Sequence, residues 1–312
     1  MQRRAILYNS AIDDPAPWKK AFAERRSDLD FRIWPDVGDA NDIRYALIWS
    51  TKDGFLRSLP NLEAIFSMGA GVDQILRDTQ FPKHIPLFRL VDAGLKEQMS
   101  EYVIYGVLRW HRRMARYEEQ QKAHKWQMLD AVHPSERTIG VMGLGVFGSD
   151  AAIKLATLGF RVFGWSRTPK VIPNVRCFAG AEEFDAFLAE TEILVNLLPL
   201  TKETHGLLNA RLLEKLPHGA ALIHLGRGAH LNEADLAAAI ERGHIGWAML
   251  DVYPTEPLPP DHPFWSNSAV FVTPHVAAQP VSDVALNFVL SNLSRFERGE
   301  EPLGRVDPNV GY

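Results

Sequence analysis

The sequence predicts an α/β protein built from two doubly wound parallel sheets, one in each of two domains. The first reason is size, because 312 residues exceed an ordinary single domain and 46% hydrophobic with 23% charged residues suits a globular chain with two cores. The second is a pattern, repeated in two blocks, of short apolar runs that alternate with helical segments. Since strands that alternate with helices form parallel sheets, each block predicts one such sheet.

The first block predicts the smaller sheet, of the flavodoxin-like kind with helices on both faces. A helical pattern over 15–26 separates its first two strands. The strand-like runs of this block lie at 5–8, 31–34, 46–49, 64–68 and 87–90.

The second block predicts a larger sheet. A long helical pattern from about 96 to 122, followed by a loop that carries Trp126, leads into it. Its strand-like runs lie at 138–142, 161–165, 193–198, 220–225, 246–252 and 269–273. Six parallel strands with helices between them make a complete dinucleotide-binding sheet.

The end of the chain predicts a discontinuous domain. A last helical pattern over 281–298 is too short to fold alone, so we expect it to dock on the first block. The first domain then covers 1–99 plus 281–312 and binds the substrate, and the second covers 100–280 and binds a dinucleotide. We expect hinges near Met99 and Pro280, and the active site in the cleft between the domains.

A glycine-rich segment, GLGVFG at 143–148, follows the first apolar run of the second block and precedes a helical pattern. In this setting Gly143 permits a tight turn, Gly145 lets the backbone approach a pyrophosphate, and Gly148 lets the helix pack closely on the strand. Together with Val146 and Phe147, these glycines open a helix whose first N–H groups bind anions. The segment predicts a Rossmann-type domain that binds a dinucleotide.

The loop after the next strand decides between NAD(H) and NADP(H). An NAD enzyme usually carries Asp or Glu there, which binds the ribose 2′-OH. This chain has Ser166, Arg167, Thr168 and Lys170 instead. Two hydroxyls and a guanidinium suit a 2′-phosphate and no carboxylate repels it, so the loop favours NADP(H). The alternative is that Arg167 and Lys170 are solvated surface charges.

Three polar residues follow successive strands of the second block: Arg227, Glu256 and His275. The carboxyl ends of parallel strands meet at one edge of a sheet, so these residues are expected to converge beside the bound nicotinamide. Arg227 suits a substrate carboxylate and the adjacent carbonyl, His275 is the expected proton donor, and Glu256 is expected to orient His275 and favour its charged form. Taken alone, each of these residues is also compatible with an ordinary surface or hydrogen-bonded side chain without a catalytic role.

Five motifs, in this order, resemble the signatures of the D-2-hydroxyacid dehydrogenase family over nearly the whole chain. They are GLGVFG at 143–148, LPLT at 198–201, LGRG at 225–228, LDV at 250–252 with Glu256 and Pro257, and TPH at 273–275. Within the family, the chain most resembles the glyoxylate/hydroxypyruvate reductase A group. That resemblance lies in MGAGVD at 68–73, WSRT at 165–168 and PHVAA at 274–278.

The resemblance implies NADPH-dependent reduction of small 2-oxo acids, glyoxylate to glycolate and hydroxypyruvate to D-glycerate. It also implies that Arg227, Glu256 and His275 form the catalytic set. The further residues that it assigns to the cofactor are Leu198, Pro199, Leu225 and Asp251, with Asp251 at the nicotinamide carboxamide. The residues that it assigns to the substrate are Trp49, Gly69, Ala70, Gly71, Arg227 and His275, with the backbone N–H groups of 69–71 at the carboxylate.

Two other functions stay open on the sequence. One is an NAD-linked dehydrogenase of another D-2-hydroxy acid, which the absence of a carboxylate at 166–168 disfavours. The other is a nicotinamide-sensing corepressor, for which the chain shows no basic nucleic-acid patch or disordered tail. One further departure is Gly226, which stands where many family members carry alanine before the catalytic arginine.

Composition disfavours several classes of partner. With 34 basic and 38 acidic residues, the net charge of −4 favours neither nucleic acid nor an anionic membrane. No apolar run is long enough to cross a bilayer, and the lone Cys177 suits a reducing compartment and offers no cysteine-based metal site. We therefore expect a cytoplasmic protein without a metal. The resemblance implies a homodimer in which Trp126 reaches toward the partner's active site.

Overall fold

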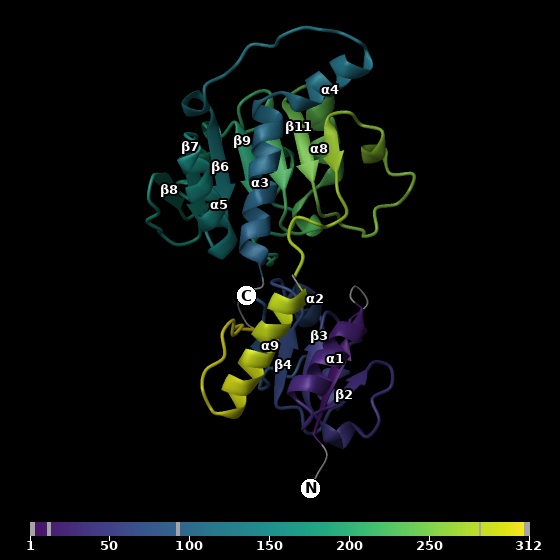
Figure 1. Ribbon diagram of the computed structural model, residues 1–312. Coiled ribbons are helices and arrows are strands. Elements are labelled where there is room, and N and C mark those ends of the chain that lie inside the picture. The colour runs from purple at the N-terminus through teal and green to yellow at the C-terminus, as the bar shows by residue number, and fades with distance from the viewer. Residues whose placement is uncertain (1–3, 11–13, 92–93, 281, 309–312) are drawn as a thin grey trace. The chain divides into compact units, whose positions relative to one another are not determined.

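A computed structural model describes residues 4–10, 14–91, 94–280 and 282–308. The chain divides into two units, Met1–Leu95 with Gln279–Tyr312, and Lys96–Ala278 (Figure 1). The crossings expected near Met99 and Pro280 lie between Leu95 and Lys96 and between Ala278 and Gln279. Each unit is described by itself.

The first unit contains a five-stranded parallel sheet in the order β2-β1-β3-β4-β5, which is the flavodoxin-like order. Its strands are β1 (Ala5–Asn9), β2 (Asp30–Ile33), β3 (Ile43–Ile48), β4 (Ala64–Ser67) and β5 (Leu87–Phe88). Its helices are α1 (Pro15–Arg25), α2 (Asp73–Leu76) and α9 (Ser282–Glu297), with short 3-10 turns η1 (Ala40–Asp42) and η2 (Leu56–Ser58). The predicted strands and terminal helix are therefore present; Val281, where that helix was expected to begin, lies outside the described residues.

The second unit contains a seven-stranded parallel sheet in the order β12-β11-β10-β9-β6-β7-β8. Its strands are β6 (Thr138–Met142), β7 (Arg161–Ser166), β8 (Val175–Ala179), β9 (Ile193–Asn196), β10 (Ala220–His224), β11 (Ile245–Leu250) and β12 (Val270–Val272). Its helices are α3 (Leu95–His111), α4 (Met114–Lys122), α5 (Val146–Thr157), α6 (Phe184–Ala189), α7 (Ala210–Leu213) and α8 (Glu233–Glu241). Short 3-10 turns lie at η3 (Pro134–Glu136), η4 (Gly228–His230) and η5 (Pro263–Trp265).

The predicted count of six strands in this sheet is wrong, because β8 was missed. Strand β8 is an edge strand that pairs only with β7, and of its five residues only Phe178 is buried. An edge strand with exposed Arg176 in its middle lacks the continuous apolar run that marks the central strands. With β8 included, the six strands β8-β7-β6-β9-β10-β11 follow the dinucleotide-binding order, and β12 extends the sheet.

Two buried clusters cover the faces of the seven-stranded sheet. On one face α3 and α5 pack against the strands, with Val107 and Leu155 fully buried, and Figure 1 shows both helices along this face. On the other face α6, α7 and α8 contribute buried residues such as Phe187 and Leu236. A parallel sheet needs apolar cover on both faces, which explains its almost uninterrupted apolar strands.

The helix expected over 96–122 is two helices. Helix α3 ends at His111 and α4 begins at Met114, with Arg113 between them in the left-handed region at φ 55°. The His111 ring is buried and lies 5.0 Å, centroid to centroid, from the Phe160 ring. No glycine or proline marks the break in the sequence, so the packing of the last turn of α3 determines where this helix ends.

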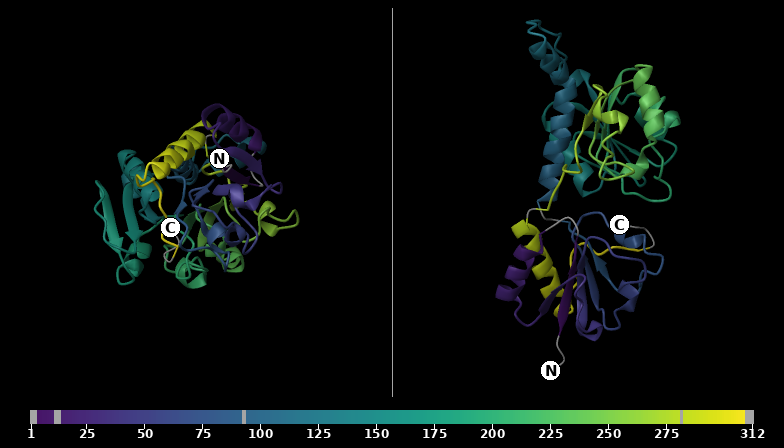
Figure 2. Two further views of the ribbon diagram at one scale, coloured as in Figure 1. Left: turned by 90° about the horizontal axis from the view of Figure 1, so that it is seen from below. Right: turned by 90° about the vertical axis from the view of Figure 1, so that its right-hand side faces the viewer.

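The C-terminal helix docks on the first unit as expected. Helix α9 lies beside α1 in both views of Figure 2, and its residues Ala285, Val289 and Leu293 are buried. Its last residue, Glu297, places an anion at the negative end of the helix dipole, an unfavourable position.

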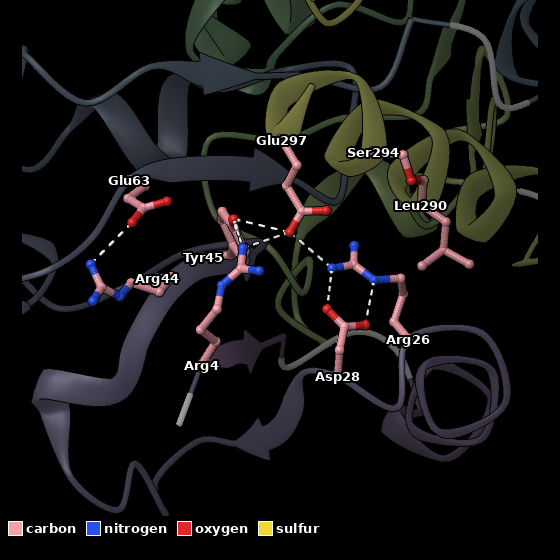
Figure 3. A network of polar contacts seen from close by, with 9 residues as sticks. All are labelled: Arg4, Arg26, Asp28, Arg44, Tyr45, Glu63, Leu290, Ser294 and Glu297. Atoms are coloured by element: carbon pink, nitrogen blue, oxygen red, sulfur yellow. Dashed lines mark hydrogen bonds and ion pairs between the residues drawn. The ribbon is translucent and has the colours of Figure 1, made fainter. Parts of the chain in front are cut away.

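Two guanidinium groups compensate for that anion (Figure 3). Glu297 Oε1 accepts hydrogen bonds from Arg4 at 2.6 Å, Arg26 at 2.9 Å and the Tyr45 hydroxyl at 3.2 Å. Arg26 also binds both carboxylate oxygens of Asp28 at 2.8 Å, and these hydrogen bonds hold the pKa of Asp28 below its ordinary value. The network ties the end of α9 to Arg4, which directly precedes β1, and to Tyr45 of β3.

No helix in the described ranges is long and apolar enough to span a membrane.

We expect Glu297→Gln to weaken this docking, because the neutral amide loses the charge-assisted part of three hydrogen bonds. The side chain is 24% exposed, so the expected loss in free energy of unfolding is about 1–2 kcal/mol. Urea denaturation measures it. Glu301→Gln is the matched control, because Glu301 and its partner Arg305 are both more than 60% exposed and the change should stay within about 0.5 kcal/mol. Equal midpoints for the two variants would contradict the role of Glu297.

Candidate active site

The candidate residues of the second unit all follow the carboxyl ends of strands in one parallel sheet. The register aligns Met142 at the end of β6 with Trp165 of β7 and Asn196 of β9. The glycine-rich segment, the loop at 166–170 and the segment at 198–199 therefore begin side by side. Strand β6 is also where the strand order reverses, the position at which ligands bind in sheets of this kind.

The glycine-rich turn has the steric features that a bound pyrophosphate requires. Gly143 lies at φ +98°, and a Cβ at Gly148 would lie 1.8 Å from the Gly143 carbonyl oxygen, so neither position tolerates a side chain. A Cβ at Gly145, in contrast, would meet no protein atom within 4 Å. Gly145 is the N-cap of α5, and the N–H groups of Val146 and Phe147 donate to no acceptor among the described residues. This open, donor-lined turn fits an anionic group.

The loop after β7 carries the residues expected at a 2′-phosphate. Arg167, Thr168 and Lys170 are exposed, and no carboxylate stands among residues 166–170. Ser166 is buried, and its hydroxyl donates to the Thr168 carbonyl oxygen at 2.8 Å. In this arrangement Ser166 shapes the loop, and the exposed cations face solvent.

A histidine–glutamate pair follows β11 and β12. Nδ1 of His275 lies 2.9 Å from Oε2 of Glu256, and the other carboxylate oxygen accepts the Tyr253 N–H at 2.9 Å. Because the carboxylate accepts, Nδ1 carries the proton, and Nε2 makes no hydrogen bond within the described residues. His275 lies at φ 56°, a left-handed conformation that non-glycine residues adopt rarely.

The environment of Glu256 favours its ionised form. Burial opposes ionisation, but the hydrogen bonds from His275 and Tyr253 and the charges of His275 and Arg227 together hold the pKa of Glu256 below its ordinary value. The structure therefore brings Glu256 and His275 into contact and places Arg227 near enough to act on the same carboxylate.

Arg227 follows β10 and is held through its backbone. Its guanidinium Nη1 donates to the Gly226 carbonyl oxygen at 2.9 Å. Its own N–H donates to His230 at 3.0 Å, and its carbonyl oxygen lies 3.0 Å from Nε2 of His224. A Cβ at Gly226 would lie 3.0 Å from Nδ1 of His230, so glycine leaves room for this ring.

Asp251 supports the turn that carries His275. Its carboxylate is completely buried and accepts hydrogen bonds from the Thr273 hydroxyl at 2.7 Å, the Val276 N–H at 2.9 Å and the Ala277 N–H at 2.8 Å. Burial raises the pKa of Asp251 although these hydrogen bonds oppose the change. The observed partners of Asp251 are thus in the chain after β12; its expected contact with a nicotinamide carboxamide stays a prediction.

Leu198, Pro199 and Leu225 lie where β9 and β10 end. Leu198 and Leu225 are buried, and the Leu198 N–H donates to the side-chain oxygen of Asn196 at 3.2 Å. A Cβ at Gly143 would lie 3.0 Å from the Leu198 nitrogen, so this segment lies beside the glycine-rich turn. The expected contact of these residues with a nicotinamide ring stays a prediction.

The remaining expected residues belong to the first unit. A Cβ at Gly69 would lie 2.5 Å from the Trp49 ring, so the two residues pack directly on each other. The N–H groups of Ala70 and Gly71 donate to no acceptor among the described residues, and Arg89 donates to the Ala70 carbonyl oxygen at 3.3 Å. Burial lowers the pKa of Arg89. This unit thus offers two N–H groups and a cation to an anion.

Sequence reasoning missed several residues that shape the site: Arg89, Asn196, His224 and His230. A signal existed for two of them. Asn196 and His224 end strands that are otherwise apolar, and a buried polar residue in such a strand needs a specific hydrogen-bond partner. Trp126, expected at a partner's site, is fully exposed and makes no contact that tests this expectation.

Comparison with known proteins gives one consistent result. The family model described as D-isomer specific 2-hydroxyacid dehydrogenase, NAD binding domain, matches residues 104–277. Glyoxylate/hydroxypyruvate reductase A of Yersinia enterocolitica is 42% identical over 312 residues, which cover 98% of this chain and 99% of that protein.

Two solved structures resemble the chain over nearly its full length. A D-isomer specific 2-hydroxyacid dehydrogenase from Xanthobacter autotrophicus Py2, in complex with NADPH and MES, has a TM-score of 0.93 and 41% identity, covering 99% of this chain and 100% of that one. An NADPH-dependent glyoxylate/hydroxypyruvate reductase from Sinorhizobium meliloti, in complex with NADP and sulfate, has a TM-score of 0.92 and 36% identity with the same coverage.

We expect Asp251→Asn to destabilise the protein. The NH2 group of asparagine would face a buried backbone N–H that now donates to the carboxylate, so two donors would meet. The expected loss is about 1–3 kcal/mol, the usual result of an unsatisfied buried donor. Thermal denaturation measures it. Asp185→Asn in the same unit is the control, because Asp185 is 68% exposed and its ion pair is with Lys215 at the surface. An Asp251→Asn variant as stable as this control would show that the carboxylate does not support the turn.

Proposed function

This chain belongs to the D-isomer-specific 2-hydroxyacid dehydrogenase family, and from that premise we propose that it reduces small 2-oxo acids with NADPH. The foremost substrates are glyoxylate, which gives glycolate, and hydroxypyruvate, which gives D-glycerate. The observation that carries the proposal is the pair His275–Glu256, bonded at 2.9 Å and following strands of the sheet that also carries the glycine-rich turn. The nearly full-length identity to glyoxylate/hydroxypyruvate reductases supports the substrate class.

The residues present fit the cofactor. The empty space beyond Gly145 and the free N–H groups at the start of α5 suit the pyrophosphate, and the cations at 167 and 170 suit the 2′-phosphate. Leu198, Pro199 and Leu225 would lie along the nicotinamide. When bound, NADPH supplies the hydride that reduces the substrate carbonyl.

The chain's own residues bind the substrate and supply the proton. Arg227 binds the carboxylate and polarises the carbonyl through its forked guanidinium, and the N–H groups of Ala70 and Gly71 bind a carboxylate oxygen. His275 donates its Nε2 proton to the oxygen that becomes the alcohol. Glu256, ionised at neutral pH, holds the ring by Nδ1 and stabilises its charged form. Trp49 limits the pocket to small substrates.

We also propose that the chain forms a homodimer with Trp126 near the partner's active site. Trp126 is fully exposed and Met128 is 90% exposed, and apolar side chains of α3 and α4 such as Tyr105 and Met114 are also exposed. Exposed apolar residues gathered on one stretch of chain mark an interaction surface. Light scattering should give twice the 35.1 kDa of one chain at micromolar concentration, and Trp126→Ala should reduce turnover. A single species of 35.1 kDa would contradict the dimer.

Arg167 should determine the choice of cofactor. In a panel of 2-oxo acids assayed with NADPH and with NADH, the wild type should prefer NADPH and small substrates. Arg167→Ala removes a charged partner of the 2′-phosphate, so KM for NADPH should rise about 10- to 100-fold while KM for NADH stays nearly constant, as expected for about 1.5–3 kcal/mol. Arg176→Ala, an exposed arginine on β8, is the control. Equal changes for both cofactors would refute this role.

The pH dependence follows from the Glu256–His275 pair. Reduction needs protonated His275, so turnover should fall as pH rises, and the oxidation of 2-hydroxy acids should improve over the same interval. Because the pKa of Glu256 is lowered, its charge is present throughout the neutral range. Glu256→Gln removes that charge, so the proton-donating form of the enzyme loses the stabilisation that the carboxylate supplies.

The falling limb of reductive turnover should therefore move to lower pH, with a modest change because the pair is about a third exposed. Initial rates from pH 5 to 9 measure it, with a solvent isotope effect to establish that the chemical step limits turnover. A profile that superimposes on that of the wild type would exclude this pair as the proton source.

A further inference from the structure

Two buried histidines hold both backbone polar groups of Arg227. His224 and His230 are completely buried, and their rings lie 5.7 Å apart, centroid to centroid, nearly perpendicular to each other. One binds the carbonyl oxygen of Arg227 and the other binds its N–H. A residue at the end of a strand, where the ladder no longer holds the chain, is thus fixed on both sides.

Each ring is also bonded to the segment that follows β9. His224 Nδ1 lies 3.1 Å from Nδ2 of Asn196, whose oxygen accepts the Leu198 N–H at 3.2 Å. His230 Nε2 lies 3.2 Å from the Pro199 carbonyl oxygen. The histidines therefore connect Arg227 to 198–199, the segment proposed to lie along the nicotinamide.

The partners determine where the protons lie. A carbonyl oxygen only accepts, so His224 Nε2 carries a proton toward Arg227 and its Nδ1 accepts from Asn196. The Arg227 N–H donates to Nδ1 of His230, so the proton of that ring lies on Nε2 and is donated to Pro199. Both rings have the same tautomer, and all four ring nitrogens have a partner of the correct kind.

The network works only with neutral rings. A second proton on either ring would face an N–H donor. Burial is the largest cause that lowers the pKa of His224 to about 3, so this ring stays neutral over the whole working range. Fixed tautomers in a buried network give rigid geometry that does not change with pH.

We propose that His224 and His230 are positioning residues that lock the backbone of Arg227 to the segment at 198–199, so that the substrate-binding guanidinium and the nicotinamide surface keep a constant relative position. This inference rests on the proposed function. A displacement of about 1 Å in a reacting group lowers the rate about 100-fold, so rigid positioning of these groups maintains the rate.

The two ring nitrogens of His230 can be replaced separately. In His230→Asn the amide oxygen takes the place of Nδ1 and accepts the Arg227 N–H, but nothing reaches Pro199. In His230→Gln the longer amide reaches Pro199, but no acceptor faces the Arg227 N–H. The first variant should keep KM for glyoxylate within about threefold and raise the NADPH Kd severalfold. The second should keep the NADPH Kd and lower kcat/KM for glyoxylate about 10- to 100-fold.

Two substitutions at position 224 test the hydrogen bond to the Arg227 carbonyl oxygen, one that keeps the donor and one that removes it. His224→Gln keeps a donor at the position of Nε2, facing the Arg227 carbonyl oxygen, and should retain most of the activity. His224→Leu removes this donor, so that the Arg227 carbonyl oxygen keeps the His230 N–H at 2.9 Å, and it removes the acceptor of the Asn196 amide. It should lower kcat/KM about 10- to 100-fold. His244→Gln is the control, because His244 makes the same kind of bond, Nε2 to the Leu213 carbonyl oxygen at 3.0 Å, away from Arg227.

The experiment measures NADPH affinity by fluorescence titration, glyoxylate kinetics with saturating NADPH, and thermal stability for all variants and the control. The opposite effects of Asn and Gln at position 230 are the decisive result, because a purely structural role would affect both measurements together. The same ratio of NADPH Kd to glyoxylate kcat/KM in both variants would overturn the proposal, even if His224→Leu fails to fold. A wild type that reduces no 2-oxo acid would refute the proposed function instead.

Discussion

The parallel direction of all seven strands in the second unit is the constraint on which the candidate site depends. Parallel strands end at one edge, so the carboxyl ends of six of the seven strands deliver the glycine-rich turn, the basic loop, the apolar segment at 198–199, Arg227, Glu256 and His275 to the same edge. Helices on both faces bury the strands and keep their ends in register. Chemistry assembled from residues more than a hundred positions apart needs no other scaffold.

The strand ends alone do not place side chains, since the ladder of hydrogen bonds stops there. Beyond the strand ends, hydrogen bonds with buried polar side chains hold the backbone instead. The carboxylate of Asp251 holds the backbone after β12, the Asn196 side chain holds Leu198, and the rings of His224 and His230 hold Arg227. Each buried group is satisfied by a backbone partner, which makes it stabilising and specific where an unsatisfied group would be costly. The candidate catalytic side chains of Glu256 and His275 stay partly exposed.

In the first unit, apolar burial and charged hydrogen bonds attach the terminal helix to the sheet. Its terminal helix is distant in sequence from the sheet that it covers and is held by a buried apolar face and by the carboxylate of Glu297 between two guanidinium groups. In the same unit, Gly69 allows the Trp49 ring to pack against the backbone, and the following N–H groups remain available. Gly69 thus leaves space for the Trp49 ring, and the backbone N–H groups that follow it are the hydrogen-bond donors.

The sequence by itself determined the fold class, most of the strands and the candidate catalytic residues, because apolar period, glycine position and motif order are local properties of the chain. It missed β8, whose stability comes from pairing with β7 and not from an apolar run, and it joined α3 and α4, which separate at Arg113 without a glycine or proline. The sequence predicted that Glu256 orients His275, and the tertiary structure added the atoms and the distance of 2.9 Å; only the tertiary structure revealed the histidines that hold Arg227. Those contacts depend on how the ends of neighbouring strands are placed in the folded sheet, and no pattern along one chain contains that information.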